Sequence, residues 1–223
     1  MKALIIPDLH LREFWKDAVK KWNDSIIFLG DYLDPYPYEW KDEYPNSIQY
    51  LLDILNFKDQ NPDRVTLLLG NHDWHYIYSS YNASRIDSFR WDELHQIYTE
   101  DIEFFQIAKQ IDDTLFTHAG VSKDWLKRHD LKLPETDADI YLNEIYKASP
   151  EIFWEMSWER GGWYSTGSPI WHDVRESDCD DTLFQVFGHS QTKENPIILE
   201  NFVDLDCRRA FVIDTVSHQV SEL

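Results

Sequence analysis

Five short apolar runs, each followed at once by polar residues, constrain this chain of 223 residues more than any other feature. The runs are rich in Ile, Val, Leu and Phe, and they cover residues 3–6, 25–29, 65–69, 115–117 and 184–187. Runs of this length and composition are typical of strands that are buried on both faces. We therefore expect a core built on β-sheet, with a polar position at the end of each strand.

Helical patterns separate the first three runs. Residues 14–22 and 48–55 each place their apolar side chains on one helical stripe, and Asn46 or Ser47 could cap the second helix. Alternating strand and helix is typical of a sheet with parallel strands. In such sheets ligands bind at the carboxyl ends of the strands, where the polar residues of this chain lie.

The rest of the chain changes character. We expect a helix over residues 86–98, a hairpin of 103–111 with 114–118 that turns at 112–113, and strands near 197–205 and 209–215. The stretch 121–182 holds helical patterns and five tryptophans, and we interpret it as an insertion packed beside the site. The whole chain, 1–223, is predicted to be a single domain with this insertion.

Charge and cysteine content exclude several classes of protein. The formal net charge is −20, so the basic surface of a protein that binds duplex nucleic acid is absent. No apolar stretch reaches the roughly 18 residues that a membrane helix needs, so we expect no membrane association. Two cysteines give no disulfide framework, and we expect a reducing, cytoplasmic location.

The polar residues at the strand ends have one chemistry in common. Carboxylate, imidazole and amide oxygen are ligands for divalent cations of intermediate softness. Burying this many such groups without a cation would cost about several kcal/mol each. The set therefore predicts a metal centre, and it comprises Asp8, His10, Asp31, Asp34, Asn71, His72, Asp73, His118 and His189.

Read in order, these residues form the series D-x-H, G-D-x-x-D, G-N-H-D, H and G-H between residues 8 and 191. The series resembles the calcineurin-like metallophosphoesterase superfamily, and most closely its phosphoprotein-phosphatase branch and the bacterial relatives of that branch. The resemblance implies an α/β fold, a four-layer αββα sandwich in which two mixed β-sheets pack together and helices cover them.

The resemblance also assigns roles to the residues. Two divalent metal ions are implied, manganese first, with iron or zinc as alternatives. Asp8 and His10 would bind the first metal, Asp31 would bridge both, and the second metal would take Asn71, His118 and His189. His72 would be the general acid for the leaving oxygen, Asp73 would orient His72, and Asp34 would steady a ligating histidine.

The chain departs from the family pattern at two positions. Gln191 stands where the wider superfamily has a histidine that binds the first metal, as in the phosphoprotein-phosphatase branch. Pro35 stands where phosphoprotein phosphatases have the arginine that grips substrate phosphate. Arg175 and Arg160, both in the insertion, are our candidates for a replacement.

Other aromatic and histidine residues are less specific. The loop 35–40 is rich in proline and aromatic residues, and it could either pack under a lid or stack on a base. His75 and His172 could reach the site, but we interpret both as structural or surface residues.

The expected activity is hydrolysis of a phosphomonoester by a metal-bridging hydroxide. The substrate would be a phosphorylated protein, with phosphoserine or phosphothreonine, or a phosphorylated small molecule. The alternative is a phosphodiesterase or a dinucleoside polyphosphate hydrolase, and a third hypothesis is a non-catalytic scaffold. The sequence leaves the physiological substrate and the oligomeric state open.

Overall fold

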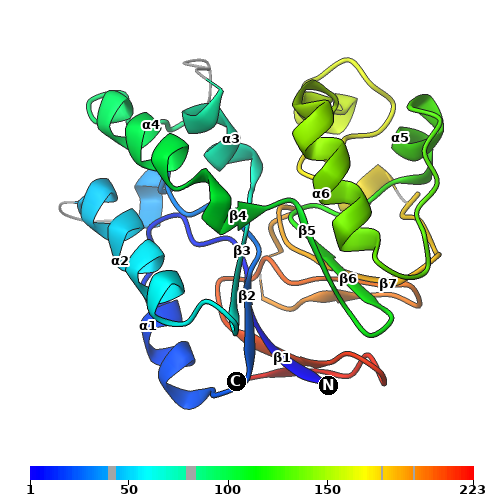
Figure 1. The fold of residues 1–223 in the computed structure, drawn as a ribbon, viewed down its shortest axis with the longest axis horizontal. Coiled ribbons are helices and arrows are strands. Elements are labelled where there is room, and N and C mark those ends of the chain that lie inside the picture. The colour runs from blue at the N-terminus through cyan, green and yellow to red at the C-terminus, as the bar shows by residue number, and fades with distance from the viewer. Residues whose placement is uncertain (40–43, 79–83, 177, 193) are drawn as a thin grey trace.

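Two β-sheets packed face to face form the centre of the computed structural model, which describes residues 1–39, 44–78, 84–176, 178–192 and 194–223 (Figure 1). Six strands in the order β11-β10-β1-β2-β3-β4 make the first sheet, and five in the order β5-β6-β7-β9-β8 make the second. Helices flank both sheets. The predicted pair of mixed sheets with outer helices is confirmed.

Parallel pairing joins the strands that carry the polar ends. In the first sheet β1 to β4 are parallel, whereas β10 and β11 are antiparallel to their neighbours. In the second sheet β6, β7 and β9 are parallel, with β5 and β8 antiparallel at the edges. The strands are β1 Lys2–Ile6, β2 Ser25–Phe28, β3 Val65–Leu68, β4 Phe105–Gln106, β5 Ala108–Ile111, β6 Thr114–Thr117, β7 Phe184–Phe187, β8 Ile197–Ile198, β9 Phe202–Asp204, β10 Phe211–Asp214 and β11 Val220–Glu222.

Helices α1 to α4 lie on the side of the first sheet, and α5 and α6 lie on the side of the second (Figure 1). The helices are α1 Phe14–Ala18, α2 Ser47–Gln60, α3 Asn71–Ile77, α4 Trp91–Glu100, α5 Lys123–Arg128 and α6 Ala138–Ala148. Short 3₁₀ helices cover Val19–Lys21, Pro37–Glu39, Ile102–Phe104, Pro150–Trp154, Trp158–Arg160 and Val174–Glu176. Asn46 caps α2, because its side chain accepts a hydrogen bond from the Gln49 amide at 3.1 Å. Among the described residues no helix is both long and apolar enough to cross a bilayer.

Alternation along the central strands builds two apolar layers. In β1, Ala3 and Ile5 belong to the layer between the sheets, whereas Leu4 and Ile6 belong to the layer under the outer helices. All four side chains are fully buried. Because successive side chains of a strand point to opposite faces, a strand covered on both sides must be apolar throughout. This rigid double layer holds the strand ends in place.

Two predicted elements differ from the structure. The helix expected over 86–98 begins only at Trp91, because Asp87 accepts hydrogen bonds from the Arg90 amide and from Ser47 and so stabilises a turn. The hairpin expected over 103–118 forms only between β5 and β6. The preceding β4 pairs with β3 of the other sheet, so the chain crosses between the two sheets at Ile107.

Candidate active site

The five polar strand ends meet in one place. Asp8 and His10 follow β1, Asp31 follows β2 and Asn71 follows β3, and β1 to β3 are parallel, so these loops share one edge of the first sheet. In the second sheet β6 and β7 are parallel as well, and His118 and His189 follow them. A cavity of about 570 Å³ opens beside these loops.

The first half of the centre consists of Asp8, His10 and Asp31, which offer ligand atoms within 4.8 Å of one another. The His10 Nδ1 lies 2.9 Å from the carbonyl oxygen of Leu33 and donates to it. Its Nε2 therefore carries a lone pair, and this atom lies 3.6 Å from Asp31 Oδ2. Two acceptors face each other, as they do across a cation.

The second half shows the same arrangement. The His118 Nδ1 donates to the Leu29 carbonyl at 2.7 Å, so its Nε2 also carries a lone pair. That Nε2 lies 3.1 Å from Asn71 Oδ1, 3.1 Å from His189 Nδ1 and 3.6 Å from Asp31 Oδ1. Asp31 thus presents one oxygen to each half of the centre.

Electrostatics support occupation by cations. Burial lowers the pKa of His10 and of His189 well below the usual range, so both rings are neutral and can ligate. Burial also raises the pKa of Asp8, because its charge is removed from water. A divalent pair would offset this cost. The donor set, two carboxylates, three imidazoles and one amide oxygen, fits such ions.

His72 lies at the edge of the centre and is held by Asp34. Its Nδ1 is 2.7 Å from Asp34 Oδ2, and the other oxygen of Asp34 accepts the Tyr76 hydroxyl at 2.6 Å. Burial lowers the pKa of His72, but the charge of Asp31 and the hydrogen bond to Asp34 outweigh it and raise the pKa overall. A histidine in this state can donate a proton at neutral pH.

The predicted roles of the two aspartates are therefore wrong. Asp34 orients His72 and not a ligating histidine, and Asp73 does not orient His72. Asp73 instead accepts the backbone amides of Gly70 at 2.8 Å, Asp31 at 2.8 Å and Tyr32 at 3.2 Å, and the Tyr98 hydroxyl at 2.7 Å. Asp73 ties the loop after β2 to the start of α3, so it fixes the position of Asp31.

This role gives a stability prediction. Asp73→Ala should lower the free energy of unfolding by at least about 3 kcal/mol, because it leaves several buried donors without an acceptor. Denaturant unfolding measures the loss, and the exposed Asp63→Ala should change stability by no more than about 0.5 kcal/mol. An Asp73→Ala protein of wild-type stability would contradict this role.

Comparison with known proteins decides the family. The model for the calcineurin-like phosphoesterases matches residues 1–192. The chain belongs to the calcineurin-like phosphoesterase family. Of its curated relatives, a serine/threonine-protein phosphatase candidate of Schizosaccharomyces pombe is 30% identical over 101 residues, which cover 44% of this chain and 30% of that protein. A protein phosphatase 2A of Dictyostelium discoideum, matched through its catalytic polypeptide, is 23% identical over 180 residues, 74% of this chain and 55% of that protein.

Solved structures share the fold. A cold-active protein-tyrosine phosphatase of a psychrophilic Shewanella species superposes with a TM-score of 0.65 at 13% identity, covering 100% of this chain and 80% of that one. A serine/threonine phosphatase from Saccharomyces cerevisiae superposes with a TM-score of 0.54 at 15% identity, covering 98% and 74%. The aligned parts span only 30% and 55% of the two curated relatives, so this calcineurin-like phosphoesterase matches part of their length.

Glycines of the family motifs make room for carboxylates. A Cβ on Gly70 would lie 2.2 Å from Asp31 Oδ1, and a Cβ on Gly188 would lie 2.2 Å from Asp8 Oδ1. His10, Asp31 and His189 also have positive φ angles of 44°, 52° and 68°, a conformation that non-glycine residues rarely adopt. Such strain concentrates at functional sites.

The arginines divide into three cases. Arg160 lines the cavity and is held by Asp173, whose Oδ2 lies 2.7 Å from its Nε. Arg175 is not among the described cavity residues, because it pairs with Asp173 and Glu159 at the surface. Arg85 was not predicted, yet it lines the cavity and its Nη2 lies 3.0 Å from His72 Nε2.

Position 191 and the aromatic loop complete the comparison with the family pattern. Gln191 is exposed, so it takes no place in the buried centre. Tyr36, from the loop 35–40, lines the cavity and packs edge-on against His10 with ring centroids 4.9 Å apart, while Trp40 lies outside the described residues. His75 also lines the cavity, together with Trp154.

Proposed function

We propose that this calcineurin-like phosphoesterase hydrolyses phosphomonoesters, with phosphoserine or phosphothreonine side chains as the first substrate class to test. The observation that carries the proposal is the convergence of six ligand side chains beside a histidine of raised pKa in one cavity. When bound, two divalent cations would generate the nucleophile by lowering the pKa of water, and would neutralise phosphoryl oxygens. Asp8, His10, Asp31, Asn71, His118 and His189 would hold them.

His72 and Arg85 would act on the two ends of the ester. In the structure Arg85 donates to His72 Nε2 and lies over the Tyr36 ring, 3.7 Å from its centroid. A phosphate group entering the cavity would draw the guanidinium toward its oxygens. The Nε2 of His72 would then be free to carry a proton and to protonate the leaving oxygen. Arg85 would thereby replace the arginine that the family pattern has at the position of Pro35.

Replacing Arg85 tests this assignment. Arg85→Ala should lower kcat/KM by about 10²-fold, because it removes one charged donor from the transition state, while metal content stays unchanged. Arg90→Ala is the matched control, since Arg90 lies in the same segment, is about half exposed and pairs with Asp87. Steady-state kinetics on a monoester that leave Arg85→Ala within twofold of wild type would remove Arg85 from this role.

Parallel assays test the substrate class. With manganese added, nitrophenyl phosphate and a phosphothreonine peptide should be hydrolysed faster than bis-nitrophenyl phosphate. Faster hydrolysis of the bis-ester would favour the alternative of a phosphodiesterase or dinucleoside polyphosphate hydrolase. Tyr36, Trp154 and Trp171 support that alternative, because all three line the cavity and could stack on a base.

Metal identity and location belong to the same proposal. Manganese is the cation that we propose first, and iron and zinc suit the same ligands. Cys179 and Cys207 are free thiols, which accords with a reducing compartment such as the cytoplasm. A non-catalytic scaffold is disfavoured, because Asn71 and His72 both lie at the centre.

A further inference from the structure

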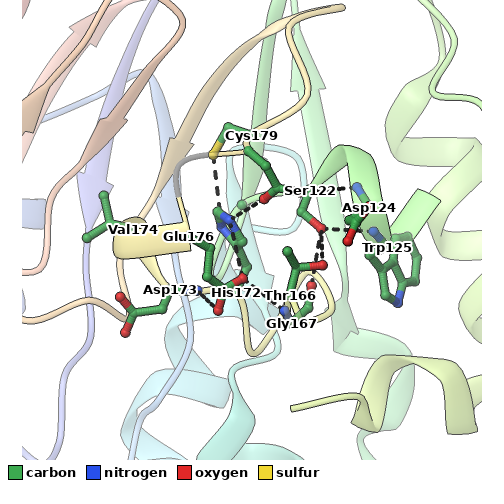
Figure 2. Close-up of polar contacts among 12 residues, drawn as sticks. Ser122, Asp124, Trp125, Thr166, Gly167, His172, Asp173, Val174, Glu176 and Cys179 are labelled. Carbon is green, nitrogen blue, oxygen red and sulfur yellow. Dashed lines mark hydrogen bonds and ion pairs between the residues drawn. The ribbon is translucent and has the colours of Figure 1, made fainter. Parts of the chain in front are cut away.

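A second cluster of ligand side chains lies outside the active-site cavity. His172, Glu176 and Asp178 offer ligand atoms within 4.8 Å of one another, and none of them is a residue of the cavity wall (Figure 2). The His172 Nε2 lies 3.2 Å from Asp178 Oδ1 and 3.6 Å from Glu176 Oε2. His172 is fully buried, whereas the Asp178 side chain is 25% exposed and gives access from solvent.

The other ring nitrogen shows what Nε2 must do. The His172 Nδ1 lies 3.1 Å from the carbonyl oxygen of Ala119, which can only accept, so Nδ1 carries a hydrogen. Cys179 Sγ lies on this same side of the ring, 3.9 Å from Nδ1. A neutral ring would therefore aim the Nε2 lone pair at two carboxylate oxygens. Nε2 must bind either a proton or a metal cation.

The spacing of the three ligand atoms fits a metal cation. Zinc–nitrogen and zinc–oxygen bonds of about 2.0–2.2 Å place tetrahedral ligands about 3.2–3.6 Å apart. The two distances from His172 Nε2, 3.2 and 3.6 Å, fall in this range.

Backbone amides hold both carboxylates in position. Glu176 accepts the amides of Gly167 at 2.9 Å and Asp173 at 3.1 Å, and Asp178 Oδ2 accepts the Asp124 amide at 3.1 Å. Ligating carboxylates are commonly fixed by hydrogen bonds of this kind.

We propose that His172, Glu176 and Asp178 form an additional site for one divalent cation, preferentially zinc, separate from the phosphoesterase centre. Zinc is preferred because one imidazole and two carboxylates leave a fourth position for water, and because zinc binds such donors more tightly than manganese does. His172 thereby has a binding role, whereas the sequence indicated only a structural or surface one.

The site would brace one wall of the active-site cavity. Trp171, the neighbour of His172, lines that cavity. Asp173, on the other side of His172, holds Arg160, which lines the cavity as well. A cation on His172 would therefore fix the segment that positions both side chains.

The proton is the competitor of the metal. Burial lowers the pKa of His172, but the hydrogen bonds with Asp178 and Cys179 outweigh it and raise the pKa to about 10. The metal-free ring is therefore an imidazolium at neutral pH. Binding of one zinc ion should release about one proton from this ring, and zinc affinity should rise with pH.

Zinc counting with two variants tests the site. After equilibrium dialysis against buffered zinc, the full-length wild type should hold one more ion per chain than Asp178→Asn. The control Asp181→Asn should hold as many as the wild type, because Asp181 is an exposed carboxylate of the same segment that pairs with Lys123. Circular dichroism establishes that the variants are folded, and Glu176→Gln should repeat the loss.

The ¹⁵N NMR signals of the His172 ring give an independent readout. At saturating zinc the imidazolium signals should disappear in the wild type and persist in Asp178→Asn. Equal zinc content in wild type and Asp178→Asn, or an imidazolium that persists in the wild type, would overturn the site. Neither readout depends on phosphatase activity, so failure of the proposed function would leave this test intact.

Discussion

Asp31→Asn should lose metal at the active site and reduce turnover to near the uncatalysed level. Asp31 is the one side chain that faces both halves of the centre among the described residues, with Oδ2 toward His10 and Oδ1 toward His118. An amide removes the negative charge and aims a donor at one of the histidine lone pairs. Without the cations, the attacking water keeps a pKa of about 15.7 in place of about 7, so hydroxide becomes scarce at neutral pH.

Metal analysis and activity assays on the same preparation check this prediction. The exposed Asp63→Asn is the matched control, because it changes the same charge far from the centre and should keep both metal and turnover. Asp31→Asn protein that retains two active-site ions and wild-type turnover would show that Asp31 bridges nothing.

His72→Ala should keep both metals and lose about 10²–10⁴-fold in turnover of alkyl phosphates, the range that a general acid contributes. The ring is pinned by Asp34 and is not a ligand in either half of the centre. Metal content therefore separates this variant from Asp31→Asn.

The leaving group gives the sharper form of the test. A nitrophenolate departs without a proton, so nitrophenyl phosphate should suffer much less than a phosphoserine peptide from the loss of His72. Asp34→Asn should show the same dependence on leaving group to a smaller degree, because it weakens the orientation of the ring. An equal loss on both substrates would contradict the role of His72 as the acid.

Much of the fold and centre could be predicted because the relevant information is local. Each candidate ligand follows a short apolar run, and parallel strands bring such positions to one edge of a sheet. Gly70 and Gly188 directly precede ligands for a reason visible only in three dimensions, since each leaves space for a carboxylate from another loop.

The role of Asp73 was misassigned although the sequence holds a signal for it. Asp73 is the third residue of α3, and a carboxylate at that position commonly reaches back to the amide that precedes the helix, here Gly70. Adjacency to His72 suggested an orienting role instead. Neighbouring residues of a helix point to different faces, so the partner of His72 comes from another loop, through Asp34.

Arg85 and the His172 cluster depend on tertiary packing alone. Arg85 is placed by a left-handed backbone conformation, φ 67°, and by its contact with Tyr36. His172, Glu176 and Asp178 have irregular spacing and join a loop to a 3₁₀ helix, so no periodic pattern marks them. Charge count and composition carry no information on either arrangement.

Anomalous diffraction from crystals soaked with manganese tests the central claim most directly. Two peaks about 3.5–4 Å apart should appear on either side of the Asp31 carboxylate, one beside Asp8 and His10, the other beside Asn71, His118 and His189. A map with no peak between these six side chains, at a manganese concentration that supports turnover, would contradict a dinuclear phosphoesterase centre.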